Sequence, residues 1–137
     1  MKIKNEYLFI GTTKDEGVLF LAEHIFFDSW EKLRTNLELY GPRTLFGVAN
    51  KSEITTTDNE KARKVIEYYV GSYENIKKEH TQGLIDMYTD ASFLYGTMKT
   101  ISYLIKHNVT VYQYIFTYKG PFSFTQIFGV PHDPIGK

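Results

Sequence analysis

The chain has 137 residues, 42% of them hydrophobic and 16% aromatic, which is enough apolar material for the core of one domain and argues against disorder. Sixteen basic residues balance 16 acidic ones, so no net field attracts nucleic acid or an anionic membrane, and we expect neither as a partner. The absence of cysteine excludes disulfides and thiolate chemistry.

Signals for targeting are weak. Residues 1–6 have no hydrophobic signal core, and no apolar run approaches the ~20 residues of a membrane span. The triplets that begin at Asn50 and Asn108 match the N-glycosylation pattern, but such triplets are common by chance. The localisation of the parent protein, secreted or cytoplasmic, is therefore left open.

The first predicted element is a strand over residues 7–13, which leads into a loop framed by Gly11 and Gly17. The apolar residues 18–21 then indicate the start of a buried helix or turn. Active sites of α/β sheets gather where strands end, so Glu16 in this loop is the first candidate for catalysis. The nearby aromatic residues Phe20, Phe26 and Phe27 are interpreted as core residues.

Three helices are predicted next. They cover residues 28–41, residues 57 or 58 to 70, and about Asp90 to His107, where Asn108 ends the last one. Gly96 inside the third helix indicates close packing against another element. The apolar faces consist of Trp30, Leu33, Leu37 and Tyr40 in the first helix, Ala62, Val65, Ile66, Tyr69 and Val70 in the second, and Leu94, Met98, Ile101 and Ile105 in the third.

The last predicted element is a strand over residues 111–118, a dense run of β-branched and aromatic residues. Residues 119–121 end it, and the remainder is predicted to be loop. Two strands about a hundred residues apart cannot form a stable sheet by themselves. We therefore expect both to belong to a larger α/β sheet whose other strands this incomplete chain lacks.

Four segments, in order, resemble motifs of the type-B carboxylesterases and cholinesterases, which are α/β-hydrolase enzymes. The resemblance covers essentially all 137 residues, and the stretch Tyr-Lys-Gly-Pro-Phe-Ser-Phe at 118–124 is most similar to insect-type carboxylesterases. The segments are residues 11–21, similar to the acid loop, residues 86–93, similar to the entry into a late helix, residues 111–118, similar to the last central strand, and residues 129–132, similar to the motif of the catalytic histidine.

The resemblance implies the C-terminal portion of an α/β-hydrolase fold, with late sheet strands plus helices, an incomplete sheet, and residues 1–137 as a partial domain. In such enzymes a serine attacks the ester, a histidine takes its proton, and a carboxylate orients the histidine. By resemblance Glu16 would be the acid and a small-molecule carboxylic ester the substrate, with no cofactor and no metal. Asp15 beside it is interpreted as a loop or cap residue.

The resemblance also points to His132 as the histidine, since it stands in Gly-Val-Pro-His and follows Glu16 by 116 residues. However, the continuation over residues 133–137 lacks the acidic and aromatic run of the family. Insect-type members often carry a variable loop before a later histidine motif, and residues 129–137 resemble that loop equally. Both interpretations stay open at this point. His24, His80 and His107 are weaker candidates, because they fall in helix-like or loop stretches.

No Gly-x-Ser-x-Gly and no Gly-Gly run occurs in the sequence, so neither the nucleophile elbow nor the oxyanion hole is encoded in it. We therefore expect the chain alone to be inactive. We also expect it to be poorly soluble or to self-associate, because the strand over residues 111–118 would lack neighbours. The favoured hypothesis is a fragment of an active carboxylesterase. The alternatives are part of a non-catalytic, cholinesterase-like adhesion or binding protein, and an independent small domain.

Overall fold

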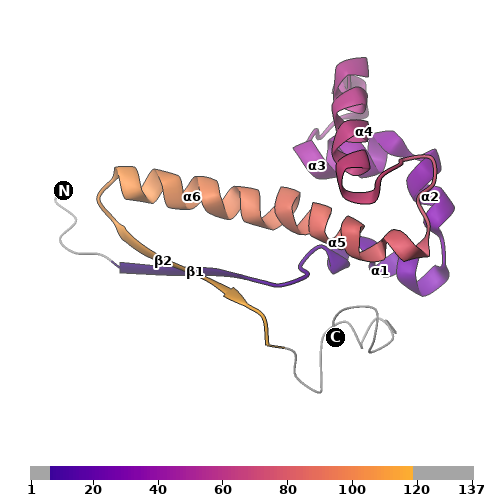
Figure 1. The fold of residues 1–137 in the computed structure, drawn as a ribbon. Helices are drawn as coiled ribbons and strands as arrows, with labels where there is room; N and C mark the ends of the chain where they lie inside the picture. The colour runs from indigo at the N-terminus through magenta and orange to yellow at the C-terminus, as the bar shows by residue number, and fades with distance from the viewer. Residues whose placement is uncertain (1–6, 119–137) are drawn as a thin grey trace.

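Two strands from distant parts of the sequence pair directly in a parallel sheet (Figure 1). The computed structural model describes residues 7–118. Strand β1 (Tyr7–Thr13) pairs with β2 (Thr110–Phe116), in a register that runs from Tyr7 opposite Thr110 to Thr13 opposite Phe116. The ring of Tyr114 lies over Gly11, where a Cβ would overlap the ring unless the exposed Tyr114 side chain moved aside.

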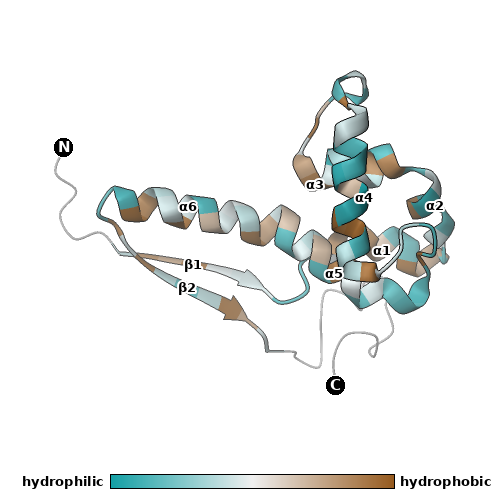
Figure 2. Cartoon of the chain, turned by 45° about the horizontal axis from the view of Figure 1, so that its top comes forward, coloured by the Kyte–Doolittle hydropathy of each residue, from teal (hydrophilic) through white to brown (hydrophobic). Residues whose placement is uncertain are grey.

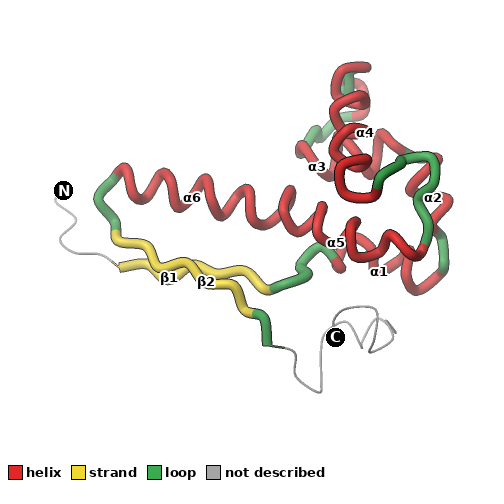
Figure 3. Tube along the Cα trace, in the orientation of Figure 1, coloured by secondary structure: helices red, strands yellow, loops and turns green. Residues whose placement is uncertain are grey.

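Between the strands the described chain is mostly helical (Figure 3). The segments α5, η4 and α6 follow one another without a break, and in Figure 1 this long helical unit runs alongside the sheet. The helices are α1 (Val18–Phe27), α2 (Trp30–Thr35), the π turn η1 (Leu39–Arg43), α3 (Thr44–Phe46), the 3-10 turn η2 (Lys51–Glu53), α4 (Thr56–Val70), the 3-10 turn η3 (Lys78–His80), α5 (Thr81–Thr89), the π turn η4 (Asp90–Leu94) and α6 (Tyr95–Lys106).

The hydrophobic core lies among the helices α1 to α5. It includes the buried side chains of Leu21 in α1, Leu33 in α2, Ile66 in α4, and Ile85 and Tyr88 in α5. Helix α4 carries both hydrophobic and hydrophilic residues along its length (Figure 2), as expected of a helix that covers a core on one side. None of the helices within residues 7–118 combines the length and the apolar character needed to cross a membrane.

His24 of α1 is a core residue. Its side chain is 1% exposed, and its Nδ1 lies 3.1 Å from both the backbone oxygen and the Oγ of Ser29. The ring packs edge-on against Tyr40, with 4.9 Å between the ring centroids. Burial lowers the pKa of His24 below its usual value, and the hydrogen bond to Ser29 opposes this shift in part.

Both predicted strands and the second predicted helix are confirmed. Strand β1 covers residues 7–13 as predicted, and β2 covers 110–116 rather than 111–118. Helix α4 begins at Thr56, with Thr55 as its N-cap. The Thr55 Oγ1 accepts a hydrogen bond from the Asp58 amide at 3.2 Å, and the Asp58 carboxylate accepts one from the Thr55 amide at 3.0 Å. This reciprocal capping box fixes the helix start earlier than the sequence pattern predicts.

The two other predicted helices have the wrong bounds. The helix expected over residues 28–41 ends at Thr35, and the chain then forms the π turn η1, which contains Pro42. Gly41 in this turn approaches α4 so closely that a Cβ there would lie 2.8 Å from the Cβ of Ala62. The helix expected from about Asp90 begins at Thr81, because α5 continues through η4 into α6.

Several predicted core positions are exposed in the described part of the chain. Met98 and Ile105 of α6 are 49% and 59% exposed, whereas Ile101 is buried. Phe26 and Phe27 are 59% and 66% exposed, so the expectation that they pack in the core is wrong. The expectation for Gly96 is wrong as well, because a Cβ there would meet no atom within 4 Å.

One face of the sheet carries five exposed aromatic side chains, here called the aromatic sheet face: Tyr7, Phe9, Tyr112, Tyr114 and Phe116. The rings of Phe9 and Tyr112 stack with 5.0 Å between their centroids. Side chains alternate along a strand, so Thr12 and Ile115 lie on the opposite face, where they line a cavity with Leu94 of η4. The arrangement is that of a partial α/β fold, as predicted: parallel sheets in complete α/β folds are covered on both faces.

Candidate active site

The loop that connects β1 with α1 carries the acidic residues singled out by the sequence. Residues 14–17 form a turn between Thr13, the last residue of β1, and Val18, the first of α1. The amide of Lys14 donates to the backbone oxygen of Phe116 at 2.9 Å, so the loop starts beside the end of β2. This acid loop, residues 14–17, therefore lies at the carboxyl edge of both strands.

The carboxylate of Glu16 is hydrogen-bonded to the last residue of β1. Its Oε1 accepts a hydrogen bond from the Thr13 amide at 2.8 Å, and the residue is half-buried. Among residues 7–118, no donor is hydrogen-bonded to the other oxygen, Oε2. The arrangement thus fixes one carboxylate oxygen and leaves the second able to accept a hydrogen bond from another group, such as an imidazole N–H.

His132, the second predicted site residue, lies outside the described residues. The strand that leads towards it is β2, which ends at Phe116 next to the acid loop. Because β1 and β2 are parallel, their carboxyl ends meet at the same edge of the sheet. The end of β2 therefore lies at the edge where Glu16 is presented.

The three other histidines have different surroundings. His24 is buried in the helical core. The Nδ1 of His80 accepts a hydrogen bond from the Lys77 amide at 3.0 Å. His107 follows the last residue of α6, with its Nδ1 2.8 Å from the Tyr103 backbone oxygen. That position precedes β2 and so lies at the opposite edge of the sheet from the acid loop.

Helix α5 holds the residues on either side of Glu16. The amide of Gly17 donates to the Oγ1 of Thr89 at 2.9 Å, and the Nε2 of Gln82 donates to the Oδ1 of Asp15 at 3.0 Å. The same Gln82 nitrogen donates to the Oδ1 of Asp86 at 2.8 Å. Asp15 has a φ of +65°, a left-handed conformation that few residues other than glycine adopt but that Asp tolerates.

Sequence reasoning missed Gln82 and Thr89. A signal exists: Gln82, Asp86 and Thr89 stand at i, i+4 and i+7, a polar stripe on one face of a helix that is otherwise rich in buried apolar residues. Such a stripe indicates a polar partner. It does not identify the partner, because the loop that it contacts lies some 70 positions earlier in the sequence.

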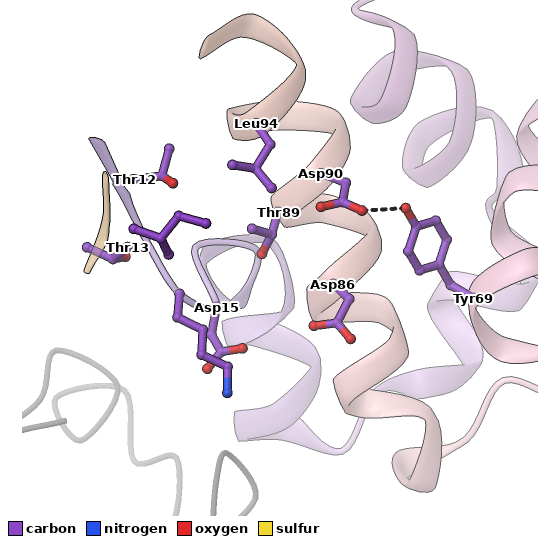
Figure 4. Close-up of a pocket in the computed structure, with 10 residues that line it drawn as sticks. Thr12, Thr13, Asp15, Tyr69, Asp86, Thr89, Asp90 and Leu94 are labelled. Carbon is purple, nitrogen blue, oxygen red and sulfur yellow. Dashed lines mark hydrogen bonds between the residues drawn. The ribbon is translucent and has the colours of Figure 1, made fainter. Parts of the chain in front are cut away.

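A cavity of about 340 Å³ opens beside the acid loop (Figure 4). In this view Thr89 lies on the side of the helix that faces the end of β1, whereas Asp90 points towards Tyr69. The Tyr69 hydroxyl donates to the Oδ2 of Asp90 at 2.6 Å, and burial together with this carboxylate raises the pKa of Tyr69. The cavity is lined by Thr12, Thr13, Lys14, Asp15, Tyr69, Asp86, Thr89, Asp90, Leu94 and Ile115.

Lys14 and Asp15 of the acid loop line this cavity, but Glu16 does not. Within residues 7–118, no group of three or more histidine, aspartate or glutamate side chains is arranged to hold a metal ion.

Comparisons with known proteins show which family the chain resembles. A family model described as the carboxylesterase family matches residues 2–134. The esterases E4 and FE4 of Myzus persicae are each 29% identical over 123 residues, which is 87% of this chain and 21% of theirs. The juvenile hormone esterase of Tribolium castaneum is 29% identical over 124 residues, 84% of this chain and 20% of its own. The chain spans about a fifth of the length of these curated relatives. No solved structure matches it.

Proposed function

The chain belongs to the carboxylesterase family, and from this membership we propose that it supplies the acid of a Ser-Glu-His triad in a carboxylic ester hydrolase. Glu16 is the proposed acid. The observation that carries the proposal is the position of its carboxylate, on the loop at the carboxyl edge of β1, with Oε1 bound by the Thr13 amide. This geometry presents a carboxylate of fixed orientation at the edge where α/β enzymes gather their reacting groups.

The proposed chemistry follows from what such a carboxylate can do. Oε2 of Glu16 accepts the N–H of a histidine imidazole, which fixes the tautomer whose other nitrogen faces the serine. When that nitrogen takes the serine proton, the negative carboxylate stabilises the imidazolium. The substrate class is a small-molecule carboxylic ester, and these steps require neither a cofactor nor a metal.

His132 is the proposed base within this chain. It lies beyond the end of β2, whose last residue Phe116 accepts a hydrogen bond from the acid loop. The alternative places residues 129–137 in a loop that precedes a later histidine. The nucleophilic serine is proposed to come from a part of the parent enzyme that this chain does not include, since the chain holds no Gly-x-Ser-x-Gly.

A chimera tests these roles. Residues 2–134 replace the matching segment of esterase E4, and the hydrolysis of p-nitrophenyl acetate is followed. Glu16→Gln keeps the shape of the side chain and removes its charge, and we expect kcat to fall by about 10⁴-fold, as for the loss of a triad carboxylate. His132→Gln is expected to lower kcat at least as far if His132 is the base, and to have little effect if it lies in a loop.

Glu23→Gln is the matched control, because Glu23 is an exposed glutamate on the adjacent helix α1 and forms an ion pair with Lys32. Its rate should equal that of the unsubstituted chimera. Equal rates for Glu16→Gln and Glu23→Gln would contradict the proposed role of Glu16. A folded chimera without activity would favour the non-catalytic, adhesion-type alternative.

The 137-residue chain alone is expected to hydrolyse p-nitrophenyl acetate no faster than a boiled sample, because it contains no nucleophile elbow. Saturable turnover by the chain alone that Glu16→Ala abolishes would refute this expectation.

A further inference from the structure

The hydroxyl group of Thr89 links the end of the acid loop to α5. The Oγ1 of Thr89 accepts the hydrogen bond from the Gly17 amide at 2.9 Å and donates its own proton to the Ile85 backbone oxygen at 2.7 Å. Both hydrogen bonds are buried, and Thr89 is 9% exposed. A valine would fill nearly the same space but could accept no hydrogen bond, so the buried Gly17 amide would lose its partner.

The contact between Gly17 and α5 leaves no room for adjustment. A Cβ at Gly17 would overlap the Ile85 carbonyl oxygen and lie 2.8 Å from the Thr89 amide nitrogen. Both neighbours are backbone atoms of a helix, which cannot move aside as a flexible side chain can. The backbone directly after Glu16 is therefore fixed to α5 both by shape and by the Thr89 hydroxyl.

The residue directly before Glu16 is fixed by the same helix. Gln82 binds Asp15, which keeps its left-handed φ of +65°. That conformation costs free energy for a residue other than glycine and persists only where the surroundings enforce it. Glu16 thus sits between two anchored neighbours, and the direction of its carboxylate depends on α5 rather than on the loop alone.

From these contacts we propose that Thr89 is a positioning residue, whose hydroxyl holds the Gly17 amide and thereby the Glu16 carboxylate in the orientation that the triad needs. The proposal rests on the proposed function of Glu16. It gives helix α5 a role in orienting the Glu16 carboxylate, and the sequence of the acid loop does not indicate that role. Misplacement of a reacting group by about 1 Å can cost about 10²-fold in rate, so the loss of one anchor has a measurable effect.

The first experiment measures the anchor itself in the full chain. Hydrogen exchange of the peptide over residues 12–21 is followed by mass spectrometry, for the unsubstituted chain, Thr89→Val and Thr89→Ser. We expect the Gly17 amide to exchange about tenfold faster in Thr89→Val, the factor that the loss of one hydrogen bond produces. Thr89→Ser keeps the hydroxyl and should restore the slow exchange.

Thr100→Val is the matched control. The Thr100 Oγ1 donates to the Gly96 backbone oxygen at 3.0 Å, the same bond to the fourth preceding residue that Thr89 forms, but Thr100 is exposed on α6. This variant should leave the exchange of residues 12–21 unchanged. If Thr89→Val does not fold, Thr89→Ala takes its place, because it removes the hydroxyl without adding a methyl group against Gly17.

The second experiment measures the consequence for catalysis in the esterase E4 chimera. We expect Thr89→Val to lower kcat by about 10- to 100-fold while KM stays unchanged, and Thr89→Ser to restore kcat. If hydrogen exchange over residues 12–21 is unchanged in both Thr89→Val and Thr89→Ala, the Thr89 hydroxyl does not anchor the Gly17 amide. Faster exchange with an unchanged kcat would overturn the positioning role. Faster exchange in Thr89→Val, together with full activity of the Glu16→Gln chimera, would contradict the proposed function of Glu16. The anchoring of Gly17 by Thr89 would still stand.

Discussion

Gly17 and Gly96 differ in how much space surrounds them: Gly17 is tightly packed and Gly96 is not. Gly17 is pressed against the backbone of α5, with the Ile85 oxygen and the Thr89 nitrogen where a side chain would go. Gly96 lies in the first turn of α6 and would place a Cβ in open space. The first glycine is required by a close approach, whereas the second only adds flexibility to an exposed helix.

The two positions give a matched prediction. We expect Gly17→Ala to lower the free energy of unfolding by about 1–3 kcal/mol, since the added methyl group overpacks a contact between backbones. We expect Gly96→Ala to raise it by about 0.5–1 kcal/mol, because alanine favours a helix. Urea unfolding followed by circular dichroism, at one dilute protein concentration, measures both. Effects of the same sign would contradict this account.

The sequence predicts the proposed acid but not its anchors. Glu16 stands out because a strand and two glycines frame its loop, and all of these signals are local. Gln82 and Thr89 contact the loop across 67 and 72 positions. No local periodicity encodes which segment a polar stripe on α5 faces, so these contacts could only be found in the structure.

The same distinction between local and distant information applies to whole elements. Strand β1 follows from an apolar run and helix α4 from helical spacing, each within one segment, although the cap of α4 is Thr55 rather than Thr57 or Asp58. The helix expected over residues 28–41 fails, because the chain turns at Gly41 and Pro42 to approach α4. Likewise, α5 extends the third predicted helix backwards: Leu84, Ile85 and Tyr88 form a buried apolar face of α5 that the prediction from about Asp90 did not include.

The capping box of α4 provides a prediction for a single element. Thr55→Ala removes the acceptor for the Asp58 amide and the partner of the Asp58 carboxylate, so we expect a loss of about 1 kcal/mol in the free energy of unfolding. Thr57→Ala is the control, because Thr57 is exposed inside the first turn and is expected to change stability by less than about 0.5 kcal/mol. Urea unfolding of both variants checks this, and equal losses would contradict the role of the cap.

At the scale of the whole molecule, α6 runs alongside one face of the sheet, and the aromatic sheet face is exposed within residues 7–118. Phe9 is 70% exposed and Tyr112 is 49% exposed, although their rings stack on each other. A contiguous apolar patch of this kind favours association with another surface. In the part of the chain that the structure describes, the sheet has only these two strands, so both of its outer edges offer backbone groups for pairing.

We therefore expect the isolated chain to self-associate, as the sequence already predicts. Sedimentation velocity should show oligomers, and Tyr112→Lys should shift the distribution towards monomer, because it places a charge on the aromatic sheet face. Tyr68→Lys is the matched control: Tyr68 is 84% exposed, but it lies on α4, away from the sheet. A monodisperse monomer of the unsubstituted chain would contradict the prediction, as would equal effects of the two substitutions.

The pairing of β1 with β2 also sets an order of events during synthesis. Tyr7 pairs with Thr110 and Thr13 with Phe116, so β1 leaves the ribosome long before its partner exists. At about 5–20 residues per second, β1 waits roughly 5–20 s for β2, while the helices between them can already form and pack. The acid loop is then anchored to α5 before the sheet beside it closes. A nascent chain that has exposed α5 but not yet β2 would therefore carry a loop already in place next to a strand that still lacks its neighbour.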